Sequence, residues 1–222
     1  MSGRMQRPLL LGHRGARAAH SIPENTLPSF DQALADGCDG FEFDVRLTAD
    51  KSAVVCHDPQ SSGVDIAQAL VKQLPALPRL EDVLARYHER AFLDVELKVA
   101  GLEAMVAAML RKFPPQRGFV VSSFLPEVLR QMRAQDSAIP LGLICETRAE
   151  LSRWKELPVE YVIPHHKLVN LEEISMIRDA GKKILVWTVN DPKAMLRFAQ
   201  AGVDGIISDD TELLARTLGG FH

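Results

Sequence analysis

Two stretches of the sequence decide the fold: GFEFDVRL at residues 40–47 and FLDVELK at residues 92–98. Apolar and charged residues alternate in both, so a β-strand would place the two kinds of side chain on opposite faces. The charged residues that would share a face are Glu42 and Asp44 in the first stretch, and Asp94, Glu96 and Lys98 in the second. The apolar faces predict packing against helices, and the charged faces need a partner that compensates their burial.

Short apolar runs typical of buried strands recur along the chain and alternate with segments of helical periodicity. The predicted strands cover residues 9–12, 41–47, 92–97, 119–122, 140–144, 161–163, 184–189 and 205–207. The predicted helices cover residues 26–36, 80–87, 102–112, 127–134, 148–155, 171–180, 192–201 and 211–218. Such alternation implies a parallel sheet with right-handed crossovers, and eight units close that sheet into a barrel. We therefore predict one compact α/β domain over residues 1–222, a TIM (β/α)8 barrel.

Two other architectures explain parts of this pattern. An open doubly wound sheet would need a Gly-rich phosphate loop after its first strand, but residues 12–15 match neither G-x-G-x-x-G nor a Walker motif. An antiparallel sheet with one solvated face would explain alternating charge, but the helices between the strands argue against it. Residues 59–77 follow a further apolar run at residues 53–56, and we expect them to form a loop with a short helix.

Composition limits the choice of partner and compartment. The chain has 26 Lys and Arg against 29 Asp and Glu, which gives no support for nucleic acid or an anionic membrane as the main partner. No apolar stretch approaches the length of a membrane span, and residues 9–11 are too short for the core of a signal peptide. Cys38, Cys56 and Cys145 lie far apart in apolar runs, which favours free thiols. We expect a cytoplasmic protein without stable membrane association.

The charged strand faces predict a cation site. In a parallel barrel, Glu42, Asp44 and Glu96 would point inward at the C-terminal ends of their strands, where the active sites of TIM barrels lie. Burying unpaired carboxylates is costly, so their convergence favours a bound cation. Because all the ligand atoms would be oxygens, we predict a hard ion, either Mg2+ or Ca2+.

Two histidines are expected at the same rim of the barrel. His13 ends the first predicted strand, and His57 ends the apolar run at residues 54–56. Imidazole is the side chain suited to proton transfer near neutral pH. Arg14 offers fixed donors for a phosphate or carboxylate. The histidines that we expect to be structural or solvated are His20, His88, His165, His166 and His222.

A charge count favours an anionic substrate at this rim. A divalent cation together with Arg14 and Lys98 would exceed the charge of the three carboxylates by one. A phosphodiester carries one negative charge and a phosphomonoester nearly two, so the balance favours the diester.

The sequence resembles the glycerophosphodiester phosphodiesterase family through an ordered series of motifs that spans nearly the whole chain. The motifs are GHRGA at residues 12–16, PENTLPSF at 23–30, GFEFDVRLTAD at 40–50, VVCHD at 54–58, VELK at 95–98, SSF at 122–124, VWTVN at 186–190 and GVDGIISD at 202–209. The resemblance implies a TIM barrel. It also implies an enzyme that hydrolyses glycerophosphodiesters, such as glycerophosphocholine or glycerophosphoethanolamine, to glycerol 3-phosphate and an alcohol.

The resemblance implies a role for each matching site residue. The positions are Glu42, Asp44 and Glu96 for the metal ligands, His13 and His57 for the acid/base pair, Arg14 and Lys98 for the phosphate-contacting cations, and Phe124 and Trp187 for the aromatic residues of the pocket. Asn25 lies in the signature segment and would either orient a catalytic group or cap the following helix. We expect the cap, with Thr26 as the alternative.

The sequence departs from the family pattern after the His-Asp pair. Family members commonly carry a longer insertion there, which forms a small lobe beside the pocket. Residues 59–63, PQSSG, replace that insertion. We expect a short loop and a more open, less selective mouth.

Two alternative functions stay open from sequence. Phospholipases of the phosphatidylinositol-specific or sphingomyelinase D type use similar barrels and a histidine pair, but this chain lacks an aromatic or basic segment for docking on membranes. A catalytically silent metal-binding barrel is disfavoured because both His13 and His57 are present. The sequence leaves open the head group, the choice of ion, which histidine is the acid, whether water or a substrate hydroxyl attacks, and whether the protein is a monomer or a homodimer.

Overall fold

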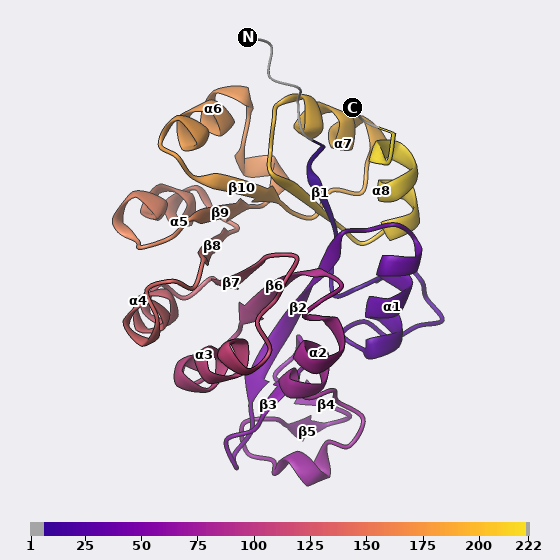
Figure 1. Cartoon of the computed structure of the whole chain (residues 1–222), viewed down its shortest axis with the longest axis vertical. Coiled ribbons are helices and arrows are strands. Elements are labelled where there is room, and N and C mark those ends of the chain that lie inside the picture. The colour runs from indigo at the N-terminus through magenta and orange to yellow at the C-terminus, as the bar shows by residue number, and fades with distance from the viewer. Residues whose placement is uncertain (1–6, 221–222) are drawn as a thin grey trace.

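The computed structural model describes residues 7–220 and shows a closed parallel barrel ringed by helices (Figure 1). In spatial order the barrel strands are β1 (Leu9–Gly12), β2 (Gly40–Leu47), β6 (Phe92–Leu97), β7 (Phe119–Ser123), β8 (Leu141–Cys145), β9 (Tyr161–Pro164), β10 (Lys183–Val186) and β11 (Gly205–Ser208). Strand β1 pairs in parallel with both β11 and β2, and these two pairings close the barrel. The predicted TIM barrel is therefore confirmed.

A helix follows each barrel strand. The helices are α1 (Leu27–Ala35), α2 (Leu80–Tyr87), α3 (Glu103–Lys112), α4 (Pro126–Gln135), α5 (Arg148–Ser152), α6 (Leu171–Asp179), α7 (Pro192–Gln200) and α8 (Thr211–Leu218). Helix α5 is short and continues as a 3₁₀-helix, Arg153–Glu156, and a second 3₁₀-helix, His166–Leu168, follows β9. The predicted strand at residues 184–189 ends earlier, at Val186, because beyond it Trp187 forms only an isolated bridge with His165.

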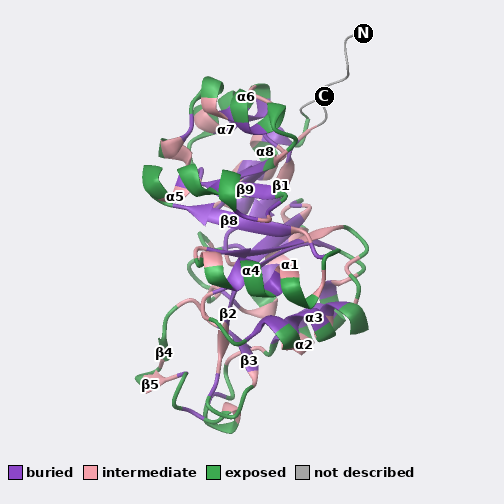
Figure 2. Cartoon of the chain, turned by 90° about the vertical axis from the view of Figure 1, so that its left-hand side faces the viewer, coloured by how far each residue is buried: buried purple, intermediate pink, exposed green. Residues whose placement is uncertain are grey.

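Two apolar layers hold the barrel, as the alternation in β2 and β6 predicts. The outward residues of β6, which include Leu93, Val95 and Leu97, belong to the core shared with the helices. The interior layer is formed by Leu11, Phe92, Val120, Ile144, Tyr161, Ile163, Leu185 and Ile207. Figure 2 shows burial concentrated in the strands, with exposure on the outer faces of the helices. The interior layer therefore forms a floor below the C-terminal rim.

Residues 53–77 fold into a small lobe that projects from one end of the molecule (Figures 1 and 2). Strand β3 (Ala53–Val55) pairs antiparallel with β2, and β4 (Gln60–Ser61) forms a hairpin with β5 (Val64–Asp65). A 3₁₀-helix, Val71–Gln73, provides the short helix that the sequence predicts. The apolar cluster of this lobe is Val54, Ile66, Ala69 and Leu74. A short loop was expected at residues 59–63 in place of a lobe; the structure instead has this hairpin in a small lobe with its own apolar cluster, which was not predicted because two-residue strands show no periodicity.

Other expectations concern single residues and the ends of the chain. Cys38 and Cys145 are buried, Cys56 is half-buried, and all three are free thiols, as predicted. Among residues 7–220, no helix combines the length and the apolar character that crossing a bilayer requires. Residues 1–6 and His222 lie outside the described residues.

Gly40, the first residue of β2, provides a test of the strand register. A Cβ atom at this position would overlap the carbonyl oxygen of Phe92, its register partner at the start of β6. We predict that Gly40→Ala lowers the free energy of unfolding by ~2 kcal/mol or more, because backbone must shift to make room. Thermal unfolding would measure the loss. Gly220→Ala, where a Cβ would meet open space, is the control; equal melting temperatures for the two variants would contradict the prediction.

Candidate active site

Three carboxylates from two neighbouring strands meet at the C-terminal end of the barrel. Glu42 and Asp44 lie two residues apart on β2, and the parallel register places Asp44 directly beside Glu96 of β6. All three residues are buried, and one oxygen of each lies within 4.8 Å of the others. The strands thus gather the predicted ligands in one place.

The chemistry of this cluster fits a divalent cation. One carboxylate oxygen of Glu42, Oε2, accepts a hydrogen bond from the backbone N–H of Arg14 at 3.0 Å, but the other, Oε1, is buried without a hydrogen-bond partner in the described chain. An unpartnered buried carboxylate oxygen costs free energy that a bound cation would offset. The donor set contains only oxygens, which suits Mg2+ or Ca2+ better than a softer metal.

The carboxylates of the cluster differ in their pKa values. Burial, followed by the charges of Asp44 and Glu96, raises the pKa of Glu42 well above its ordinary value. Burial and the charge of Asp44 raise the pKa of Glu96 to about 7. Burial acts on Asp44 too, but the charges of Lys98 and Arg14 outweigh it and lower that pKa. A bound divalent cation would favour the charged form of all three groups.

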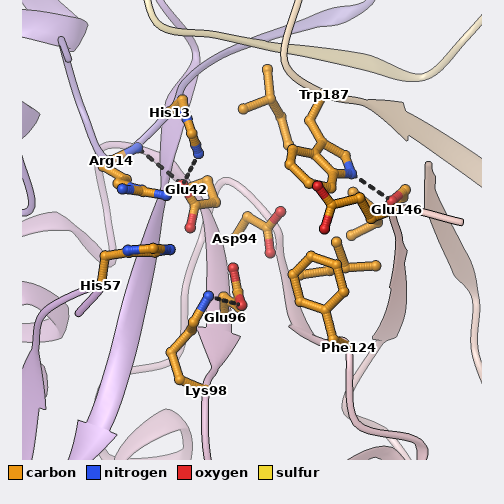
Figure 3. A pocket seen from close by; sticks show the side chains of 13 residues that line it. His13, Arg14, Glu42, His57, Asp94, Glu96, Lys98, Phe124, Glu146 and Trp187 are labelled. Atoms are coloured by element: carbon orange, nitrogen blue, oxygen red, sulfur yellow. Dashed lines mark hydrogen bonds and ion pairs between the residues drawn. The ribbon is translucent and has the colours of Figure 1, made fainter. Parts of the chain in front are cut away.

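The two predicted phosphate-binding cations lie among these carboxylates. Nζ of Lys98 is 2.7 Å from Oε1 of Glu96 and 3.3 Å from Oδ1 of Asp44. Nε of Arg14 is 3.3 Å from Oδ2 of Asp44, and its Nη1 donates to Glu24 at 2.7 Å. Arg14 and Lys98 therefore face the cluster from two sides and line the same cavity (Figure 3).

Asn25 holds Asp44 in place and does not cap helix α1. Its Nδ2 donates to Oδ2 of Asp44 at 2.7 Å, and its Oδ1 accepts the backbone N–H of Asp44 at 3.3 Å. The cap is Thr26, whose hydroxyl accepts the N–H of Ser29, so the expected cap at Asn25 was wrong and the alternative is correct. The buried amide of Asn25 therefore fixes the position of the Asp44 carboxylate.

The loop that carries Asn25 is held in an uncommon conformation. Asn25 and Arg14 have φ values of 57° and 54°, in the left-handed region that non-glycine residues rarely adopt. The N–H of Asn25 donates to the carbonyl of Arg14 at 3.0 Å, which ties the two together. Both residues contact Asp44, and backbone strain at residues that hold a site together is typical of functional sites.

Both predicted histidines are anchored through Nδ1 by a carboxylate. In His13, Nδ1 donates to Oδ1 of Asp209 at 2.7 Å, and Nε2 lies 3.9 Å from Oε2 of Glu42. In His57, Nδ1 donates to Oδ1 of Asp58 at 2.8 Å. The two rings line the cavity and point into it in Figure 3. Each histidine therefore presents Nε2 for proton transfer.

The surroundings also shift the pKa values of Asp209 and His57. Burial alone would raise the pKa of Asp209, but hydrogen bonds from His13 and Asn190 and the contact with Arg17 hold it well below the ordinary value. Burial, with the charges of Arg14 and Lys98, lowers the pKa of His57, although Asp58 acts in the opposite direction. Asp209 is therefore a stable anion under His13.

Aromatic side chains close the opposite half of the cavity. Phe124 follows β7 and Trp187 follows β10, and their rings meet edge to face with centroids 5.8 Å apart. The cavity has a volume of about 320 Å³ and is bordered by both. Eight of the nine predicted site residues line it, and the ninth, Asp44, lies in the carboxylate cluster behind it. None of the other described histidines lines this cavity.

Three residues of the site were not assigned from sequence. Asp209 follows the end of β11, and the strand-end argument that singled out His13 could have found it. Asp94 shares the inward face of β6, but it is fully buried, accepts a hydrogen bond from Ser122 at 2.5 Å, and has a pKa that burial raises to about 7. Glu146 directly follows β8 and lines the cavity, and the same strand-end argument could have found it.

Comparison with known proteins identifies the family. The model of the glycerophosphoryl diester phosphodiesterase family matches residues 13–76 and 62–213, and the two matches overlap inside the lobe of residues 53–77. A glycerophosphodiester phosphodiesterase from Caldanaerobacter subterraneus is 28% identical over 234 residues, with 93% of this chain and 96% of the relative covered.

Solved structures agree. A phosphodiesterase from Oleispira antarctica, in complex with the product sn-glycerol-3-phosphate, has a TM-score of 0.83 and 26% identity, covering 96% of this chain and 98% of that one. A glycerophosphodiester phosphodiesterase from Thermotoga maritima has a TM-score of 0.81 and 26% identity, covering 95% and 98%. Fold and site together define a phosphoric diester hydrolase of the TIM-barrel type. Within that class, the chain belongs to the glycerophosphoryl diester phosphodiesterase family.

The amide of Asn25 yields a prediction for metal affinity. Asn25→Gly keeps access to the left-handed conformation but removes both contacts with Asp44. Residues that orient a metal ligand typically contribute ~10- to 100-fold to affinity, so we expect a loss of that size for Mg2+ or Ca2+. Calorimetric titration of the metal-free protein measures it. Ser62→Gly, at a positive φ in the distant lobe, is the control, and equal affinities in both variants would count against the role of Asn25.

Proposed function

We propose that this protein hydrolyses small glycerophosphodiesters to glycerol 3-phosphate and an alcohol, with a divalent cation, Mg2+ or Ca2+, held by Glu42, Asp44 and Glu96. One observation carries the proposal: a buried carboxylate cluster and two Nδ1-anchored imidazoles face the same cavity, in a chain of this family. The product bound to the related Oleispira antarctica phosphodiesterase supports the same product here.

The charges at this end of the barrel suit a monoanionic phosphate. When bound, the cation would supply Lewis-acid stabilisation of the charge that develops on the phosphate oxygens. Arg14 and Lys98 add fixed positive charge on either side of the cluster. Glu24 does not disturb this balance, because it is shared between Arg14 and Arg17. A diester, with its single negative charge, matches the remaining excess better than a monoester.

The histidines would perform the proton transfers. One takes a proton from the attacking hydroxyl, whether that of water or of the substrate's glycerol, and the other donates a proton to the departing alkoxide. Each role contributes ~10^2- to 10^4-fold in rate. Asp209 and Asp58 fix the imidazole tautomers by accepting from Nδ1, so the exchangeable proton or lone pair lies at Nε2 of each ring. His13 lies beside Glu42, and His57 lies on the same side of the cavity, opposite the aromatic residues (Figure 3).

A substrate panel tests this function. Glycerophosphodiesters with different head groups would be assayed for release of glycerol 3-phosphate with Mg2+, with Ca2+ and with a chelator. We expect activity that depends on the metal. His13→Ala and His57→Ala should each lose ~10^2-fold or more in kcat and keep metal binding, whereas Glu42→Gln should lose the metal itself. Full activity in chelator, or unchanged turnover in both histidine variants, would refute the mechanism.

Asp58 allows the two histidine roles to be assigned. The hydrogen bond and the charge of Asp58 favour protonated His57, so Asp58→Asn should lower the pKa of that imidazole further. If His57 is the base, the acidic limb of the pH profile of kcat/KM moves to lower pH; if it is the acid, the alkaline limb does. Asp65→Asn, which makes the same change at a half-buried carboxylate in β5 of the lobe, is the control. A profile with neither limb displaced would show that His57 does not titrate in the reaction.

A further inference from the structure

The cavity has two chemically different halves, and the proposed function uses only one of them. The first half is formed by carboxylates, cations and His13 on or after β1, β2 and β6, together with His57, which follows β3. Around the other half stand Phe124, Glu146 and Trp187, which follow β7, β8 and β10 respectively (Figure 3). The remaining neighbours there are the apolar side chains Ile144, Ile163 and Ile207. This aromatic half is where the alcohol of a bound diester can lie once its phosphate is at the cationic half.

The two rings of the aromatic half are held in fixed positions. Nε1 of Trp187 donates to the carbonyl of Ile163 at 2.9 Å, and the ring of His165 packs edge to face against it with centroids 5.3 Å apart. The face of Phe124 already accepts a cation, because Nζ of Lys98 lies 5.6 Å from its centroid. The indole N–H already has a hydrogen-bond partner, so the two rings can contact a ligand only through their π-surfaces.

Glu146 gives this half a negative charge. Its carboxylate points into the cavity beside Trp187 in Figure 3, and it forms no ion pair with any Lys, Arg or His of residues 7–220. Its backbone N–H donates to Glu150 at 2.9 Å, which fixes the start of the loop. A carboxylate without a cationic partner, next to aromatic rings, attracts a positively charged ligand group.

The same half offers little to a polyol. A glycerol or inositol head group needs several hydrogen-bond donors and acceptors, since its hydroxyls lose water on binding. Here the indole N–H is already used and the isoleucines have no polar side-chain atoms, so Glu146 is the main polar side chain. An alkylammonium group needs only π-surface and negative charge. Its nitrogen lies two carbons from the ester oxygen in choline and ethanolamine, which suits a small cavity.

We propose that the aromatic half is an alkylammonium subsite, formed by Glu146, Trp187 and Phe124, and that diesters with a cationic alcohol are the preferred substrates. This inference rests on the proposed function for the placement of the phosphate. The subsite itself can be probed without any turnover.

A binding experiment compares choline with neohexyl alcohol, its neutral isostere in which carbon replaces nitrogen. Affinity for the metal-loaded protein would be measured by ligand-observed NMR titration. We expect choline to bind at least ~5-fold more tightly, as a cation–π contact beside a carboxylate implies. Glu146→Gln and, independently, Trp187→Leu should abolish most of this difference. Glu212→Gln, which removes an exposed carboxylate on α8, should preserve it. Equal affinities for the two alcohols in the unmodified protein would overturn the proposal.

A kinetic experiment separates the subsite from the reaction. The ratio of kcat/KM for glycerophosphocholine to that for glycerophosphoglycerol should fall ~5-fold or more in Glu146→Gln and stay constant in Glu212→Gln. An unchanged ratio in Glu146→Gln would overturn the subsite and leave the hydrolytic function intact. Failure to hydrolyse any diester, together with selective choline binding, would instead refute the hydrolytic function and leave the subsite intact.

Discussion

The burial of Glu42, Asp44 and Glu96 side by side on β2 and β6 is the constraint on which the rest of the site depends. One oxygen of each lies within 4.8 Å of the others, and desolvation, followed by mutual repulsion, raises the pKa of Glu42 and Glu96. This arrangement persists because the parallel register of β2 and β6 fixes the three residues side by side. The opposite face of both strands packs against the helices, so the carboxylates point into the barrel. A bound cation would relieve this repulsion and desolvation, and the free energy so gained would contribute to its binding.

The groups around the cluster are arranged to keep it charged and oriented. Lys98 and Arg14 counter the repulsion around Asp44, and the amide of Asn25 fixes that carboxylate by two hydrogen bonds. The loop carrying Asn25 and Arg14 adopts the left-handed region at both residues. The histidines follow the same principle, because each has its Nδ1 bound by a carboxylate and its Nε2 directed at the cavity. Most residues around the site therefore hold the carboxylates and the imidazoles in position, and only a few groups would take part in the chemistry.

The barrel also explains why the cavity is divided into two halves. Strands β1, β2 and β6 adjoin one another and carry the charged residues, whereas the segments after β7, β8 and β10 lie across the mouth and carry Phe124, Glu146 and Trp187. A diester is itself divided in this way, with an anionic phosphate and an alcohol of variable character. The lobe of residues 53–77 supplies His57 from the end of β3 and has an apolar cluster of its own.

The sequence by itself determined the eight strand and helix units, the inward carboxylates and the histidines at strand ends, because periodicity and strand ends are local properties of a chain. Its motifs also indicated the family and the aromatic positions. The tertiary structure alone decided that Asn25 binds Asp44 and leaves the helix cap to Thr26, and that Asp209 lies under His13. It also decided the hairpin of the lobe and the position of Glu146. The partners of Asn25 and Asp209 lie far apart from them in the chain, and the strands of the hairpin are too short to show a period, so none of these leaves a local signal. Strand ends mark Asp209 and Glu146 in the sequence, but only the fold shows which groups they face.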